Sequence, residues 1–308
     1  MTVALAALLE EVAAAPVPIA DPGPVIDELR DRLETAATEA VDGLGAEHLP
    51  VRLPKARVAE LLACEQLAVT ASASGRSLSE PVVRGRILDR LLHHHVHGGG
   101  PAPGPALAVA VGAFEAERDD EVVAWLDHDP DLRARLAEDA SGFAERLQTL
   151  GPIDPAWWPR CEDRLRVDLA DGAVVCAAQL DLVTGGGPTG LPMVILEAKS
   201  GPFTADHRDG LFWYALLAAL RHGFPPRGVI GWSAWEGRAW WQPVTADVLR
   251  SAATRGEEAL ARLAALLGGR APARTACRAC AWCAERPTCP AARPLDGGED
   301  GGGFGDGW

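Results

Sequence analysis

Three polar side chains stand within two strongly apolar segments of this 308-residue sequence. Asp181 lies in the run Gln-Leu-Asp-Leu-Val, and Glu197 and Lys199 end the run Ile-Leu-Glu-Ala-Lys. If the two runs are neighbouring strands, their carboxylates meet and offer the hard oxygen ligands that Mg²⁺ or Mn²⁺ prefers, with the Ala198 carbonyl as a third ligand. Such a cation can polarise a phosphate and lower the pKa of a water, so the pattern indicates metal-assisted phosphodiester hydrolysis.

Lysine is rare in the sequence, which makes its presence beside Glu197 informative. Of the 29 basic residues only Lys55 and Lys199 are lysines. Arginine carries the same charge on a bulky fork, whereas lysine presents one compact ammonium that can hold a water. We therefore expect Lys199 to act in the chemistry. The alternative is a solvated glutamate-lysine pair at a strand tip, because motifs this short also arise by chance.

The cysteines form a second pattern. Three of the seven form a C-x2-C-x5-C run at Cys280, Cys283 and Cys289, and Cys64 lies far upstream. Four thiolates suit a [4Fe–4S] cluster, and a structural Zn²⁺ is the alternative because zinc sites also use C-x2-C pairs. Cys277 repeats the C-x2-C spacing and is a spare. The odd number of cysteines and the absence of a secretory signal favour an intracellular protein over a disulfide framework.

Taken together, these residues resemble the PD-(D/E)XK nuclease superfamily, in which an aspartate and an E-x-K motif follow consecutive strands. The closer likeness is to its RecB-like branch, which includes AddB-type nuclease domains with a C-terminal iron-sulfur staple, and it runs here from about residue 64 to residue 289. The resemblance implies that Asp181 and Glu197 hold the metal and that Lys199 orients the water. It also implies that Cys64 and the C-x2-C-x5-C run bind the cluster and tie the N-terminal helical part to the C-terminus.

Two departures from the family pattern concern the remaining site residues. The branch usually carries G-x3-H on an N-terminal helix, with the histidine as a metal ligand, and here Gly85 is followed by Asp89. Aspartate is itself a good Mg²⁺ ligand, so we expect Asp89 to complete the metal shell, with His93 one turn further on. The family also often has Q-h-x-x-Y after the lysine, and Tyr214 keeps the tyrosine without the glutamine. Tyr214 is expected to orient Lys199 or contact DNA, and a half-buried helix aromatic is the alternative.

Periodicity and turn residues predict the elements that must position these groups. Helical spacing covers residues 24–41, 57–70, 81–96, 106–126, 132–150, 205–222 and 246–267. Apolar and β-branched runs predict strands at residues 165–169, 173–183, 191–199, 228–235 and 238–244. Helix, three strands, helix and two strands is the order of a restriction-endonuclease-like core. We therefore predict a mixed α/β fold, with a mixed central sheet flanked by helices and an additional N-terminal helical region.

The chain length and a hydrophobic content of 48% allow a substantial buried core. We divide the chain into an N-terminal helical region at residues 1–150 and a nuclease core at residues 151–270. A cysteine-rich staple follows at residues 271–294. The tail at residues 295–308, rich in glycine and aspartate, is predicted to be disordered.

The net charge of −14 is unfavourable for contact with phosphates, but its distribution is uneven. Residues 51–100 carry 7 basic and 4 acidic side chains, and residues 251–294 carry 7 and 3, so both segments are positive. The same segments contain the predicted cluster cysteines, and we therefore expect the stapled region to face DNA. Arg84, Arg86 and Arg90 stand around the predicted ligand Asp89.

These observations predict a Mg²⁺- or Mn²⁺-dependent DNA nuclease, an exonuclease acting on single strands or ends in DNA repair or recombination. The preference for ends follows from the resemblance alone. No G-x4-G-K-[ST] motif is present, so a helicase or recombination partner would supply ATP-driven unwinding. A second hypothesis is a catalytically weak or inactive DNA-binding or assembly subunit, and a third is a zinc-stapled protein acting on RNA. No segment is apolar enough to suggest a membrane span, and we expect a cytoplasmic protein.

Overall fold

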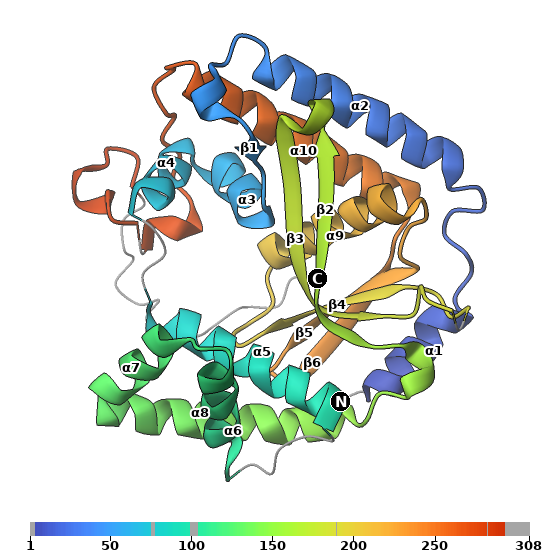
Figure 1. Ribbon diagram of the computed structural model, residues 1–308, viewed down its shortest axis with the longest axis vertical. Helices are drawn as coiled ribbons and strands as arrows, with labels where there is room; N and C mark the ends of the chain where they lie inside the picture. Colours follow the sequence, from blue (N-terminus) through green and yellow to red (C-terminus); the bar gives the residue numbers. More distant parts are fainter. Residues whose placement is uncertain (1–3, 75–77, 99–103, 189, 282, 293–308) are drawn as a thin grey trace.

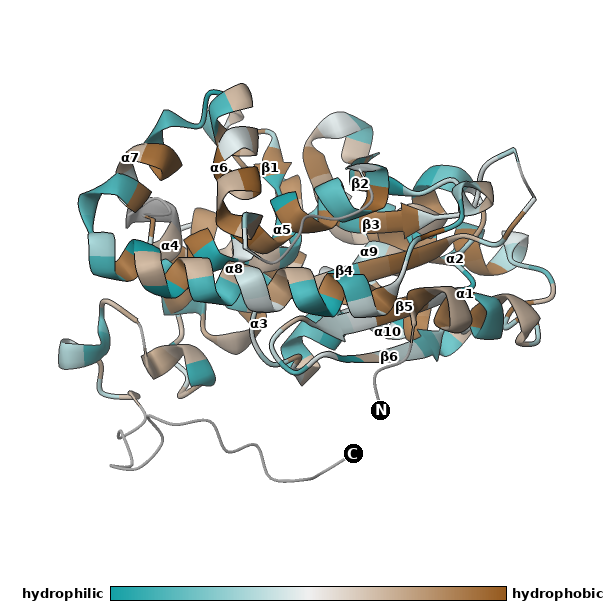
Figure 2. Ribbon diagram, turned by 90° about the horizontal axis from the view of Figure 1, so that it is seen from below, coloured by the Kyte–Doolittle hydropathy of each residue, from teal (hydrophilic) through white to brown (hydrophobic). Residues whose placement is uncertain are grey.

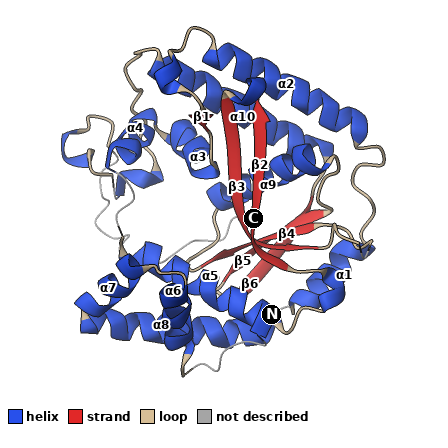
Figure 3. Cartoon of the chain, in the orientation of Figure 1, coloured by secondary structure: helices blue, strands red, loops and turns tan. Residues whose placement is uncertain are grey.

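The computed structural model describes residues 4–74, 78–98, 104–188, 190–281 and 283–292. Within these ranges, ten α-helices and a six-stranded mixed sheet form a mixed α/β fold, with helices on both faces of the sheet (Figure 1, Figure 3). The predicted fold class is therefore confirmed. The tail predicted at residues 295–308 lies outside the described residues. No helix in the described ranges is long and apolar enough to cross a membrane.

The sheet contains every predicted strand and one short strand that was not predicted. Its strands are β1 (Val51–Arg52), β2 (Arg160–Leu169), β3 (Val174–Thr184), β4 (Val194–Lys199), β5 (Gly228–Ser233) and β6 (Arg238–Pro243). They follow the order β1-β3-β4-β5-β6, and β2 also pairs with β3. The pairs β2·β3, β3·β4 and β5·β6 are antiparallel, whereas β1·β3 and β4·β5 are parallel. The parallel pair β4·β5 is joined through a helix, as such connections require.

The helices surround this sheet. They are α1 (Leu5–Ala14), α2 (Gly23–Val41), α3 (Lys55–Ala63), α4 (Glu65–Ser74), α5 (Glu80–Gly98), α6 (Ala106–Ala116), α7 (Asp120–His128), α8 (Pro130–Leu150), α9 (Ala205–His222) and α10 (Ala246–Leu267). Two segments predicted as single helices are each divided. Cys64 is extended, with φ −165°, and separates α3 from α4, and Arg118 has φ 59° between α6 and α7. Each break involves only one to three residues, which helical spacing does not reveal.

Two apolar cores lie on opposite faces of the sheet. One contains side chains from α2, α3, α9 and α10, and the other contains side chains from α1 and α5 to α8. Figure 2 shows the apolar strands between these layers. In β4, Ile195 belongs to the first core and Leu196 to the second, as expected for side chains that alternate across a strand. The helices of residues 1–150 thus contribute to both cores.

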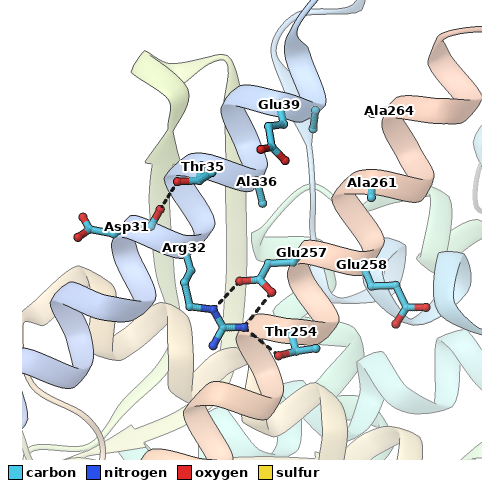
Figure 4. Close-up of a pocket in the computed structure, with 11 residues that line it drawn as sticks. Asp31, Arg32, Thr35, Ala36, Glu39, Thr254, Glu257, Glu258, Ala261 and Ala264 are labelled. Carbon is cyan, nitrogen blue, oxygen red and sulfur yellow. Dashed lines mark hydrogen bonds and ion pairs between the residues drawn. The ribbon is translucent and has the colours of Figure 1, made fainter.

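The outer helices α2 and α10 are joined by ion pairs. Arg32 on α2 donates to Glu257 on α10 at 2.8 Å and to the Thr254 hydroxyl at 2.9 Å (Figure 4). The depression between the helices is also lined by Asp31, Glu39 and Glu258 (Figure 4). This acidic surface offers no attraction for phosphate, so it does not suit nucleic acid.

Candidate active site

The pairing of β3 with β4 brings the predicted carboxylates together. The antiparallel register joins Leu182 to Leu196, and Asp181 and Glu197 are the next residues along their strands. Because side chains alternate, both carboxylates point to the face that α3 and α9 cover. The amide of Ala198 donates a hydrogen bond of 2.8 Å to Asp181 Oδ2. The two carboxylates therefore lie together, as the sequence pattern predicts.

Glu197 is the centre of this group. Its side chain is 1% exposed, and its Oε1 is ion-paired with both Lys199 and Lys55. The other oxygen, Oε2, is buried and has no hydrogen-bond partner among the described residues. Leaving a buried carboxylate oxygen unpartnered is costly, so this atom marks a position for a cation. Lys55 was not among the predicted site residues, although the rarity of lysine is the same signal that pointed to Lys199.

Burial and neighbouring charges shift the pKa values of Asp181 and Glu197 in opposite directions. Burial raises the pKa of Asp181 to about 8, and the charge of Glu197 adds to the rise. Burial also acts to raise the pKa of Glu197, but the ammonium groups of Lys199 and Lys55 outweigh it and lower that pKa to about 2. Burial acts to lower the pKa of Lys199, and the charges of Glu197 and Asp181 hold it above its ordinary value. The metal-free site thus pairs a protonated carboxyl with an ionised one, and binding of a divalent cation would release a proton.

Asp89 approaches the same group from α5. Burial raises its pKa to about 6, against the opposing charges of Lys199 and Arg90. Helix α5 contacts β4, and a Cβ at Gly85, one turn before Asp89, would lie 3.9 Å from the Ser200 hydroxyl oxygen, so this part of α5 lies beside the end of β4. His93 is exposed, and the centroid of its ring lies 4.7 Å from that of His97. The expectation that His93 shares the site is wrong, because one further turn of α5 carries it to the solvent-facing side.

The three arginines near Asp89 are engaged within the protein. Their carboxylate partners are Asp139 for Arg84, Asp119 for Arg86, and Glu117 and Glu162 for Arg90. These pairs join α5 to α8, to the turn after α6 and to β2. The arginines thus act as links between elements, and their charges are already balanced.

Tyr214 reaches the site through Lys55. The tyrosine is buried on α9, and Lys55 Nζ lies 4.3 Å from the centroid of its ring. Burial raises the pKa of Tyr214 well above its ordinary value, so the phenol is neutral. The ring therefore supports the ammonium that pairs with Glu197, which differs from the expected direct role on Lys199.

His207 is a further neighbour of the site that was not predicted from the sequence. Burial and the charges of Lys199 and Lys55 lower its pKa to about 4, so its imidazole is neutral. Its Nδ1 accepts a hydrogen bond of 3.1 Å from the amide of Thr204 in the capping box that begins α9. The capping role accounts for its position.

The carboxylates suit a divalent cation chemically but are not arranged as a formed metal centre. Among the described residues, no group of three or more histidine, cysteine, aspartate or glutamate side chains is placed to hold a metal ion. The reason lies in their present partners, because Asp181 Oδ2 accepts from Ala198 and Glu197 Oε1 is taken by two lysines. Glu197 Oε2 remains for a cation, and Asp181 and Asp89 would supply further oxygens.

Five cysteines line one cavity between α4 and the segment after α10. They are Cys64, Cys277, Cys280, Cys283 and Cys289. Figure 1 shows this C-terminal segment beside α4. No disulfide joins any of the seven cysteines, and the amide of Cys277 donates to Cys280 Sγ at 3.3 Å. The sulfurs are not gathered into a formed centre, but four of them suffice for a [4Fe–4S] cluster or a Zn²⁺ ion.

Protein contacts also hold the C-terminal segment against α4. Glu65, which follows Cys64, is buried and accepts a hydrogen bond of 2.7 Å from the amide of Ala273. Arg270 donates to the same carboxylate at 2.7 Å. The first part of the segment is therefore fixed without any bound group.

Comparisons with known proteins identify no family. No protein-family model matches this chain, and no curated protein matches it. Among solved structures, the chain is similar to a protein described as the crystal structure of SSO0001, with 12% sequence identity and a TM-score of 0.34. The likeness covers 86% of this chain and 96% of that one. A similarity of this size carries no functional argument, so the function is inferred from the geometry of this chain.

Replacing Asp181 with asparagine is expected to remove a pH-dependent loss of stability from the metal-free protein. The pKa of Asp181 rises from 3.8 to about 8 in the fold, so the folded state keeps a proton that the unfolded chain releases. The contribution of the Asp181 carboxyl group to the free energy of unfolding is therefore fully present below about pH 4, and it is lost as the pH rises through about 8. Asparagine retains an oxygen for the Ala198 amide and does not titrate.

Thermal melting in metal-free buffer measures this difference. Between about pH 5 and about pH 8, the fall in Tm should be smaller for Asp181→Asn than for the natural protein, by on the order of 5 °C. An equal fall in both proteins would contradict the raised pKa of Asp181.

Proposed function

We propose that this chain is a Mg²⁺- or Mn²⁺-dependent nuclease that hydrolyses phosphodiester bonds in DNA. One observation carries the proposal: a buried glutamate, Glu197, leaves one oxygen unpartnered among the described residues while it pairs with Lys199 and lies beside Asp181. A buried group of charges is poor evidence of a stabilising role, because apolar residues of similar size often serve stability as well or better. The arrangement is better explained by chemistry.

Each residue of the group has a part in the proposed reaction. Asp181, Glu197 and Asp89 would hold the cation, with the Ala198 carbonyl as a further oxygen. When bound, the cation supplies polarisation of the scissile phosphate and a lower pKa for water. Lys199 is suited to hold the attacking water and to balance the charge that develops on the phosphate.

We also propose an exonuclease of the RecB-like type, which acts on single strands or ends in DNA repair or recombination in the cytoplasm. The support is the order of the aspartate and the E-x-K motif on paired strands, together with the cavity lined by cysteines. A [4Fe–4S] cluster bound by Cys64, Cys280, Cys283 and Cys289 would stabilise the C-terminal segment, and Zn²⁺ is the alternative occupant. A helicase or recombination protein would be the partner.

Activity measurements with Lys199→Ala test the proposal. The natural protein with Mn²⁺ is expected to degrade labelled single-stranded DNA, and the variant is expected to lose roughly 10²- to 10³-fold in kcat/KM because it cannot orient the water. Arg250→Ala is the matched control, since it also removes one basic side chain, in an exposed pair with Glu28. Equal cleavage by the natural protein and Lys199→Ala would reject the mechanism.

A second candidate function is a DNA-binding or assembly subunit with little or no turnover. The absence of a formed metal centre among the described residues favours it. Calorimetric titration with Mn²⁺ separates the two functions. A chain that binds no Mn²⁺ and shows no cleavage, but binds DNA, is the subunit.

A further inference from the structure

The two lysines of the chain meet at one atom. Lys199 on β4 and Lys55 at the start of α3 both ion-pair with Glu197 Oε1, although 142 positions separate Lys55 from Glu197. Every other basic residue in the sequence is an arginine. One ammonium group is enough to balance the negative charge of Glu197, so charge balance does not explain the second lysine.

A glycine on α9 leaves the space that the Lys55 side chain occupies. Its stem crosses Gly210, where a Cβ would lie 2.6 Å from Lys55 Cδ, so a larger residue would force the stem to move. Its ammonium then rests on the ring of Tyr214, in a favourable cation–π contact. Gly210 stands four residues before Tyr214, at the glutamine position of Q-h-x-x-Y. The lysine stem therefore occupies space that a side chain at this position would fill.

Lys55 also faces open space beside the site. Its side chain is 25% exposed and lines a cavity of about 1060 Å³ together with Asp206, Gly210 and Trp213. Its long stem can turn into this cavity, whose lining includes Lys55 and not Lys199. Two ammonium groups would repel a divalent cation at Glu197, and Lys55 has this cavity to move into.

We propose that Lys55 is a second active-site lysine, which rests on Glu197 in the metal-free protein and binds a phosphate of the nucleic-acid substrate in the working site. This inference rests on the proposed nuclease function and adds a substrate contact that the aspartate and E-x-K pattern does not contain. A compact ammonium is a suitable point charge for phosphate. Without substrate, Lys55 competes with divalent cations for Glu197.

Binding measurements with Lys55→Met test the proposal, because methionine removes the charge while Lys199 still pairs with Glu197. The affinity for a fluorescein-labelled single-stranded oligodeoxynucleotide is measured by anisotropy in Ca²⁺ at several salt concentrations. We expect it to fall about tenfold, and the slope of log Kobs against log salt to decrease by about 0.7, the value for one phosphate contact on a single strand. Calorimetry with Mn²⁺ alone should show binding at least as tight as in the natural protein. Lys55→Arg should recover most of the salt slope.

Gly210→Ala gives an independent test because it displaces the Lys55 stem and keeps its charge. It should weaken oligonucleotide binding in the same direction, and it keeps the proposal testable if Lys55→Met does not fold. The matched control is Gly112→Ala on α6, where a new Cβ meets nothing within 4 Å. Unchanged affinity and salt slope in folded Lys55→Met would show that Lys55 is only a counter-ion and would overturn the inference. Failure of the natural protein to cleave DNA with Mn²⁺ is a different result, since it rejects the nuclease function itself.

Discussion

Replacing Glu197 with glutamine is expected to abolish Mn²⁺-dependent cleavage and to lower the free energy of unfolding by about 2 kcal/mol. Glu197 is 1% exposed and is the shared partner of Lys55 and Lys199. Removing one partner of a fully buried ion pair costs about 3–5 kcal/mol. Both lysines are partly exposed, at 25% and 26%, and can turn toward water, so the cost falls below that range.

The loss of activity has a separate cause. Glutamine has the shape of glutamate but lacks the negative charge that a Mg²⁺ or Mn²⁺ ligand supplies. A reduction of kcat/KM by roughly 10³-fold or more is expected, equivalent to about 4 kcal/mol of transition-state stabilisation. Cleavage of labelled single-stranded DNA measures the activity, and urea unfolding of the metal-free protein measures the stability.

Glu257→Gln provides the matched control for both effects. Glu257 also pairs with a basic residue, Arg32, but their side chains are 26% and 32% exposed on the outer surface of α2 and α10 (Figure 4). Its removal should cost about 0–1 kcal/mol and leave cleavage unchanged. If Glu197→Gln cleaves DNA as fast as the natural protein, the active site lies elsewhere in the chain.

The parts of the site that could be predicted from sequence are those set by local patterns. In the structure, α9 begins at the capping box of Thr204 with His207 and ends at the left-handed Gly223, with φ 76°. Its range, residues 205–222, is the one that helical spacing predicted, and the apolar runs that form β3 and β4 predicted that Asp181 and Glu197 meet. Such signals act over a few residues and are legible in the sequence.

The remaining features depend on contacts between distant segments. Lys55 joins Glu197 only because α3 packs against α9, and no periodicity reports that packing. β1 is two residues long and is defined by its pairing with β3. Likewise, the partial burial of Asp89 and the exposure of His93 depend on how α5 lies against the sheet, not on their shared spacing.

Replacing Cys64 with serine is expected to remove the bound cluster and to release the C-terminal segment. Cys64 is the upstream member of the five cysteines that line the cavity, and a cluster there would cross-link residues more than two hundred positions apart. A cross-link worth about 3 kcal/mol corresponds to a fall in Tm of roughly 5 °C for a chain of this size. The contacts of Glu65 with Arg270 and Ala273 remain, so the release should begin after Ala273. Limited proteolysis locates its start.

Iron analysis after anaerobic preparation decides which cysteines bind the cluster. The natural protein should contain about four iron atoms per chain, and Cys64→Ser should contain almost none. Cys277→Ser is the matched control, because Cys277 lines the same cavity and the other four thiols still complete the ligand set. Loss of iron from Cys277→Ser, or its retention in Cys64→Ser, would contradict this assignment. Zinc in place of iron would identify the occupant as a structural Zn²⁺ and leave the argument for the cross-link intact, since either group joins the start of α4 to the C-terminal segment.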